Sequence, residues 1–133
     1  MSHFQAVYYR AADGTEPVRD YLEALDAKRR AALKNQVERL NLLDEADPHL
    51  PHPYTSQVEG ELRELRCHYG SELYRILYRR SERLMVLLHV FRKRSRKVPE
   101  ADVRLARRRW RDFAARMEAR PRRRPRAAGK DAP

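Results

Sequence analysis

Basic side chains in the second half of the chain are the groups whose types and spacing could do chemistry. Arg66 and Arg75 lie in two apolar runs, LRELRCHY and LYRILYRR, and residues 92–97 read RKRSRK directly after a third run, LMVLLHVF. Guanidinium groups bind phosphate oxygens through charge-assisted hydrogen bonds, and one well-placed donor to a developing oxyanion is worth roughly 2.7–4 kcal/mol. The pattern favours binding and cleavage of a phosphodiester.

The residues that could carry a proton are harder to choose, because guanidinium is a poor base at neutral pH. Lys93, His68 and His89 are the titratable candidates. His89 lies in the middle of an apolar run, where a histidine is more often a hydrogen-bonded core residue. His68 lies beside an expected hairpin loop, where a surface role and a role in the site are equally compatible with the sequence.

Several other kinds of site are disfavoured by the same sequence. The five histidines show no metal-ligand spacing, and the pair His49-x-x-His52 lies in a proline-rich segment. Cys67 is the only cysteine, so neither a disulfide within the chain nor a Cys-x-x-Cys metal site can form. The four glycines form no phosphate-binding loop, and no G-x-S-x-G motif is present. We therefore expect no metal and no cofactor.

Charge is distributed unevenly along the 133 residues, whose formal net charge is +11. Residues 1–61 contain 7 Lys/Arg and 11 Asp/Glu, whereas residues 62–133 contain 23 Lys/Arg and 8 Asp/Glu. A basic half of this kind attracts a polyanion such as RNA. No apolar run approaches the roughly 20 residues that span a bilayer, and the N-terminus lacks a signal-peptide pattern, so we expect a cytoplasmic protein without membrane attachment.

Apolar periodicity predicts a single α+β domain over residues 1–118. The expected elements are a strand at 4–9, helices at 17–25 and 26–43, strands at 62–69, 73–80 and 84–91, and a helix beginning at Pro99. The proline-rich segment 44–60 is expected to hold a packed loop or a helical turn. Residues 119–133 are rich in proline and arginine, with little to bury, and are expected to form a disordered basic tail.

The three consecutive strands should bring the basic groups together. In an antiparallel meander, the end of the first strand adjoins the start of the second, and the third strand ends on the same side. Arg66 ends the first run, Arg75 lies in the second within Leu-Tyr-Arg-Ile, and residues 92–94 leave the third. Topology alone therefore predicts that these cations converge on one end of the sheet.

Three segments form a more specific pattern: PVRDYLEAL at 17–25, ELRELRCHYGSELYRILY at 61–78 and LLHVFRKRSRKVP at 87–99, followed by the basic helix ADVRLARRRWRDF. With these segments the chain resembles the RelE/ParE superfamily of type II toxin–antitoxin toxins, most of all its HigB-type, phage-derived branch, over about residues 4–118. The resemblance implies a RelE-like fold, a small twisted antiparallel sheet with an N-terminal αα-hairpin and a C-terminal helix.

The resemblance also implies an activity and partners. It implies an endoribonuclease that enters the ribosomal A site and cleaves mRNA during translation, without a metal or cofactor, and that a HigA-like helix-turn-helix antitoxin neutralises. The catalytic positions that it implies are Arg66, Arg75, Lys93 and Arg94, and the expected RNA-binding positions are Arg92, Arg96, Lys97 and His68.

The chain departs from RelE-type enzymes in its proton carriers. It has no lysine between Lys34 and Lys93 and no tyrosine after Tyr78, and Leu62 and Glu64 stand about where RelE-type lysines would be. The RelE proton-transfer scheme therefore does not transfer to this chain. Two alternatives stay open: a ParE-like inhibitor of DNA gyrase on the same fold, and a protein that binds RNA or ribosomes without cleaving.

Overall fold

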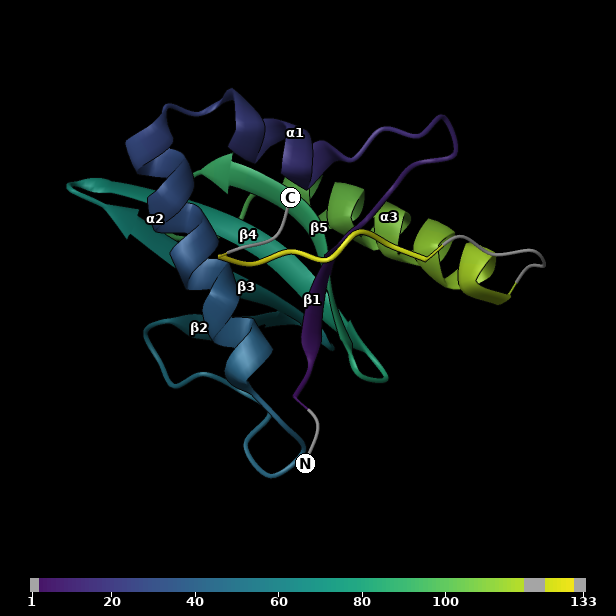
Figure 1. The fold of residues 1–133 in the computed structure, drawn as a ribbon. Coiled ribbons are helices and arrows are strands. Elements are labelled where there is room, and N and C mark those ends of the chain that lie inside the picture. The colour runs from purple at the N-terminus through teal and green to yellow at the C-terminus, as the bar shows by residue number, and fades with distance from the viewer. Residues whose placement is uncertain (1–2, 119–123, 131–133) are drawn as a thin grey trace.

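The computed structural model describes residues 3–118 and 124–130, which form an α+β fold with the helices on both sides of one sheet (Figure 1). The elements are β1 (Gln5–Tyr8), α1 (Pro17–Ala24), α2 (Ala27–Glu38), the 3-10 turn η1 (Arg39–Leu42), β2 (Thr55–Glu59), β3 (Leu62–Tyr69), β4 (Glu72–Ser81), β5 (Leu84–Arg92) and α3 (Glu100–Glu118). The predicted fold class, with its N-terminal helical hairpin and C-terminal helix, is confirmed.

The sheet is mixed rather than purely antiparallel. Its strand order is β1-β5-β4-β3-β2. The meander β3-β4-β5 is antiparallel, as predicted, and β2 adds to it in the same manner. β1 instead pairs in parallel with β5. β2 is an additional strand, within a segment that the sequence predicted as a packed loop or helical turn.

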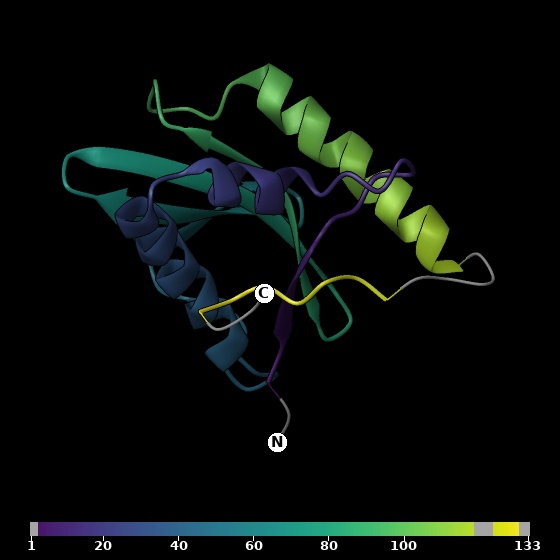
Figure 2. The ribbon, with the colours of Figure 1, turned by 45° about the horizontal axis from the view of Figure 1, so that its top comes forward.

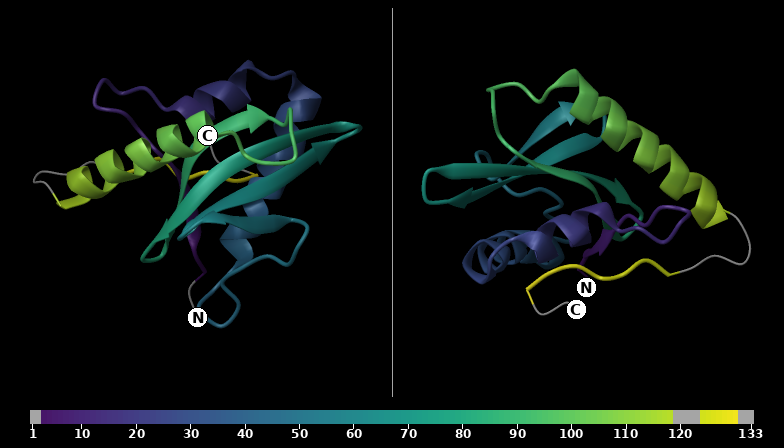
Figure 3. Two further views of the ribbon diagram at one scale, coloured as in Figure 1. Left: turned by 180° about the vertical axis from the view of Figure 1, so that it is seen from behind. Right: turned by 90° about the horizontal axis from the view of Figure 1, so that it is seen from above.

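The two faces of the sheet are covered by different helices. α1 and α2 lie on one face and α3 crosses the other, which is clearest from above (Figure 3). Because side chains alternate along a strand, Ile76 and Tyr78 of β4 are buried in the core beneath α1 and α2, whereas Leu77 is buried in the core beneath α3. β5 is buried on both faces, as its unbroken apolar run predicts.

α3 covers only part of its face. Val103, Ala106 and Phe113 are buried along the predicted apolar stripe, and the helix packs mainly on β5 and β4. A Pro-ended loop, residues 93–99, joins β5 to α3. The part of this face formed by β2 and β3 is therefore not covered by α3 and lies beside this loop, which we call the basic loop.

Residues 124–130, within the expected disordered tail, run beside the outer edge of β1 (Figure 2). Tyr8 N–H donates to the Arg126 carbonyl at 2.9 Å, and Ala128 N–H donates to the Ala6 carbonyl at 2.7 Å. The Asn41 amide accepts from Ala6 N–H and donates to the Ala128 carbonyl. The expectation of disorder is not met over these residues, because β1 needs partners for its outer backbone groups; residues 119–123 and 131–133 lie outside the described part.

Candidate functional site

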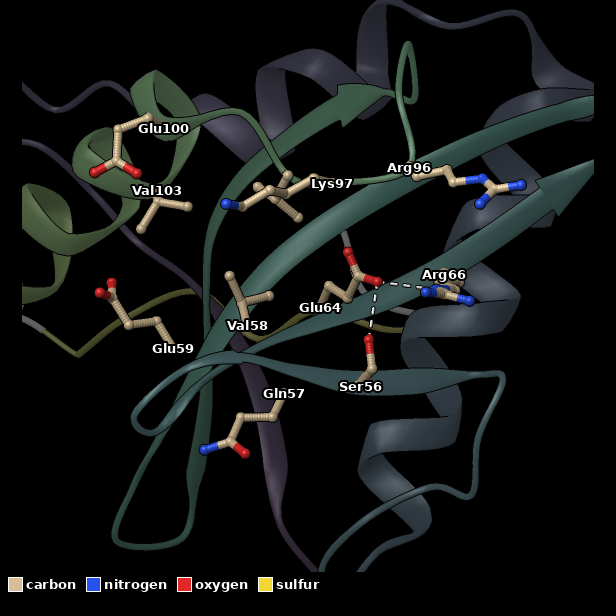
Figure 4. Close-up of a pocket in the computed structure, with 11 residues that line it drawn as sticks. Ser56, Gln57, Val58, Glu59, Glu64, Arg66, Arg96, Lys97, Glu100 and Val103 are labelled. Atoms are coloured by element: carbon tan, nitrogen blue, oxygen red, sulfur yellow. Dashed lines mark hydrogen bonds and ion pairs between the residues drawn. The ribbon is translucent and has the colours of Figure 1, made fainter.

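A hollow of about 420 Å³ lies where α3 leaves the sheet uncovered (Figure 4). Its floor and walls come from two stretches of the chain that are distant in sequence, namely the hairpin of β2 and β3, and the basic loop with the start of α3. The lining residues are Ser56, Gln57, Val58 and Glu59 of β2, Glu64 and Arg66 of β3, Arg96, Lys97 and Val98 of the basic loop, and Glu100 and Val103 of α3. We call this cavity the charged hollow.

Glu64 is the buried charge of the hollow, with only 3% of the residue exposed. Its Oε1 atom accepts hydrogen bonds of 2.9 Å from the Ser56 hydroxyl and from Arg66 Nε, and its Oε2 atom lies 3.3 Å from Arg75 Nε. A buried carboxylate of this kind requires cationic partners. Glu64 thereby fixes the positions of two guanidinium groups from neighbouring strands.

Arg75 lies beneath the hollow and not in it. Arg66 and Arg75 are direct cross-strand partners, which confirms the predicted convergence of these two residues. Arg75 is 1% exposed, and its Nη2 atom donates to the Arg96 carbonyl at 2.5 Å. Because its guanidinium is held between Glu64 and the backbone of the basic loop, Arg75 supports the loop from below.

The basic loop and Arg92, the last residue of β5, carry exposed cations. Arg92, Lys93, Arg94, Arg96 and Lys97 are exposed, and none forms an ion pair within the described part of the chain. Elsewhere the arginines on the surface are often paired, as in Arg29 with Glu72, Arg79 with Glu61 and Arg80 with Glu45. The positive charge of the loop is therefore available to an external anion.

These cations face two sides of the sheet. Arg96 and Lys97 line the charged hollow with Arg66. Arg92 and Arg94 lie nearer α1, where burial raises the pKa of Tyr21 and the charges of the two arginines oppose that rise. The structure thus divides the predicted cluster into a group in the hollow and a group beside α1.

Two further residues of the predicted site lie outside the hollow. Lys93 is exposed at the end of β5, where its backbone N–H donates to the Leu73 carbonyl at 2.7 Å. His68 is exposed on β3, two residues beyond Arg66 and close to the β3–β4 turn. Neither lines the hollow, although both lie at the same end of the sheet.

His89 connects the sheet to α3, in line with the expectation of a hydrogen-bonded core histidine. Its Nε2 atom lies 2.6 Å from Asp102 Oδ1, and its ring stacks on Phe91. Burial lowers the pKa of His89, Asp102 opposes this shift, and the charge of Arg109 adds to it. His89 therefore anchors the start of α3, beside the basic loop.

Sequence reasoning assigned no role in the site to Ser56 or Glu64. Ser56 lies in the segment 44–60, where no strand was expected. Glu64 could have been found from alternation in ELRELR, because positions 64 and 66 share a face of β3. Within residues 3–118 and 124–130, no group of three or more His, Cys, Asp or Glu side chains could hold a metal ion, and no helix is long and apolar enough to cross a membrane.

Comparison with known families places most of the chain in one of them. A family model described as "Phage derived protein Gp49-like (DUF891)" matches residues 20–111. This range contains every residue that lines the charged hollow, and it excludes β1 and the C-terminal segment. No curated protein matches the chain.

Proposed function

Because the chain belongs to the phage-derived Gp49-like family, which is associated with toxin–antitoxin systems, we propose that it is a toxin that cleaves messenger RNA on the ribosome. The proposed partners are mRNA in the ribosomal A site and a HigA-like helix-turn-helix antitoxin. Its proposed place of action is the cytoplasm, where translation occurs.

The single observation that carries the nuclease proposal is the unpaired charge around the hollow. Arg66, Arg96 and Lys97 face one cavity, and the two loop residues have no carboxylate partner among the described residues. Phosphate neutralisation by such cations supplies most of the sequence-independent affinity for nucleic acid. A phosphodiester seated at this end of the hollow would meet donors from β3 and from the loop together.

The geometry supports cleavage through the 2′-hydroxyl of the RNA itself. Attack of this oxygen on phosphorus forms a 2′,3′-cyclic phosphate, breaks the bond to the 5′ oxygen and builds negative charge on the phosphate oxygens, while the proton of the 2′-hydroxyl passes to solvent water. Arg66 is pre-oriented by Glu64, and the backbone of Arg96 is fixed by Arg75, so the donors need little reorganisation, which is the basis of electrostatic catalysis. Lys97 replaces Lys93 as the proposed proton donor to the leaving 5′ oxygen, because Lys97 lines the hollow.

Glu64 has a positioning role in this proposal. Both of its oxygens already lie against Ser56, Arg66 or Arg75. Its contribution is therefore to hold Arg66 in place at the hollow and Arg75 in place beneath it.

Induction of the chain in bacteria, followed by mapping of mRNA 5′ ends, tests the proposal. We expect growth arrest with cuts inside translated frames for the wild type and loss of both for Arg66→Gln. Arg111→Gln is the matched control, because Arg111 is an exposed arginine on α3 outside the hollow. Intact mRNA with DNA breaks would identify a gyrase inhibitor instead, and intact mRNA with stalled ribosomes would identify a non-cleaving ribosome binder.

A further inference from the structure

The charged hollow has ends of opposite sign. Arg66 and Arg96 lie at one end, and Glu59 and Glu100 lie at the other (Figure 4). Lys97 and the apolar side chains of Val58 and Val103 lie between the two ends. A site that served only to hold a phosphate chain would not need carboxylates, because they repel phosphate.

The acidic end presents a carboxylate without an internal partner. Glu100 is the first residue of α3, is exposed, and has no ion pair among the residues that the structure describes. Glu59 is paired with Arg107 at the rim, with both side chains about half exposed. Glu100 is therefore the acceptor that faces the hollow.

The hollow also has the features of a built site. Its volume of about 420 Å³ lies within the roughly 300–1,000 Å³ of small-molecule sites. Its charged wall residue Glu64 is almost fully buried, and Arg75 beneath it has a buried Nη1 atom without a hydrogen-bond partner. Buried side chains thus hold Arg66 in place at the cationic end, whereas Glu100 at the acidic end is exposed to solvent.

We propose that the hollow holds one RNA nucleotide, with its phosphate at Arg66 and Arg96 and its base at Glu100, and that it selects guanine. This inference rests on the proposed function, because it names the substrate preference of the same site. The valine side chains between the two ends pack against the apolar faces of the base.

Guanine is selected because its hydrogen-bonding edge matches a carboxylate. The N1–H and N2–H groups of guanine are adjacent donors, which can form two parallel hydrogen bonds to the two oxygens of Glu100. Adenine and cytosine offer an amino donor beside a ring acceptor, and uracil offers one N–H between two carbonyl oxygens that the carboxylate repels. The expected order of affinity is guanine first and uracil last.

Binding of trinucleotides to the full chain tests the preference without the ribosome. The probes are U-X-U sequences in which hydrogen replaces every 2′-hydroxyl, so that they cannot be cleaved, and X is G, A, C or U. Isothermal titration should give a dissociation constant for the G probe about 5- to 100-fold below that for the U probe, the range of one bidentate base contact.

The Glu100→Gln variant separates base recognition from phosphate binding. The glutamine amide has one acceptor and one donor, so the G-to-U ratio should fall to about 1–2 while the affinity for the U probe is kept or increases. Glu118→Gln is the matched control, because Glu118 is an exposed acid at the far end of α3, and it should preserve the wild-type ratio.

The possible results distinguish the two proposals. Equal wild-type affinity for all four probes, with binding lost in Arg66→Gln, would overturn the guanine inference and leave the phosphate site standing. An undiminished G-to-U ratio in Glu100→Gln would also overturn the inference. Absence of binding by any probe would count against the phosphate site, and hence against the proposed function as well.

Discussion

Replacing Arg75 with methionine should destabilise the fold substantially, because Arg75 and Glu64 form an almost fully buried ion pair. Their side chains are 2% and 4% exposed. Removing one partner of a buried pair costs about 3–5 kcal/mol of unfolding free energy, since the other charge is left uncompensated. Glu64 keeps Arg66 and Ser56 as donors, so we expect the lower end of this range, about 3 kcal/mol.

Guanidinium denaturation followed by Trp110 fluorescence measures this loss. Arg30→Met is the control, because Arg30 pairs with Glu23 at the surface, with both side chains about one-third exposed; such a pair is worth about 0–1 kcal/mol. In the double variant Arg75→Met with Glu64→Leu, most of the lost stability should return, since apolar residues often replace a buried ion pair at little cost.

The loop provides a second readout of the same variants. Arg75 donates to the Arg96 carbonyl, and the double variant lacks this donor even though its stability is restored. Trypsin should therefore cut within residues 92–97 faster in both the single and the double variant than in the wild type. If Arg75→Met is no less stable than Arg30→Met, or if the loop is cut at the wild-type rate, Arg75 does not hold the loop.

Two further predictions concern the ends of the sheet. A methyl group added in Gly129→Ala would lie 2.4 Å from Glu38 Oε1, and Gly129 has a φ of 149°. The Glu38 carboxylate would have to move away from the N–H of Lys130, so the C-terminal segment should be held less firmly and the amide of Tyr8 should exchange its hydrogen faster. Gly60→Ala is the control for backbone strain, because Gly60 also has a positive φ, 57°, but its added methyl group meets nothing within 4 Å; unchanged exchange at Tyr8 would refute the contact. Burial lowers the pKa of His89 below its unfolded value, so the unfolded chain binds more protons, and the free energy of unfolding should fall as the pH decreases from about 7.5 to 5.5. The His89→Gln variant should show a smaller dependence of this free energy on pH. An identical dependence in the variant and the wild type would contradict the role of His89.

The periodicity of the sequence was sufficient to predict the antiparallel meander and the residues that it brings together. The apolar runs that became β3, β4 and β5 predicted their pairing, and the pairing predicted that Arg66 and Arg75 would be neighbours. Alternation also shows which side chains share a face. Alternation does not show that the basic loop folds over Arg75. The position of the loop depends on the hydrogen bond that Arg75 donates to the Arg96 carbonyl, and this contact leaves no pattern in the sequence.

The elements that sequence reasoning missed depend on distant partners. β2 is a five-residue edge strand, and the preference of such a strand for the sheet comes from its neighbours more than from its own residues. The C-terminal segment has the composition of a disordered tail. It is held by Asn41, by the Glu38 carboxylate and by an ion pair between Arg126 and buried Glu16, and no local pattern brings these residues together.

The closure of the β1 edge also has a consequence for when the protein finishes folding. The hydrogen bond between Gln5 and the Ala128 carbonyl joins residues 123 positions apart, and β1 must in addition wait for β5. Contacts of such long separation form late, because the intervening chain must first be ordered. During synthesis, β1 therefore stays without its outer partner until residue 128 has emerged, 123 positions after Gln5.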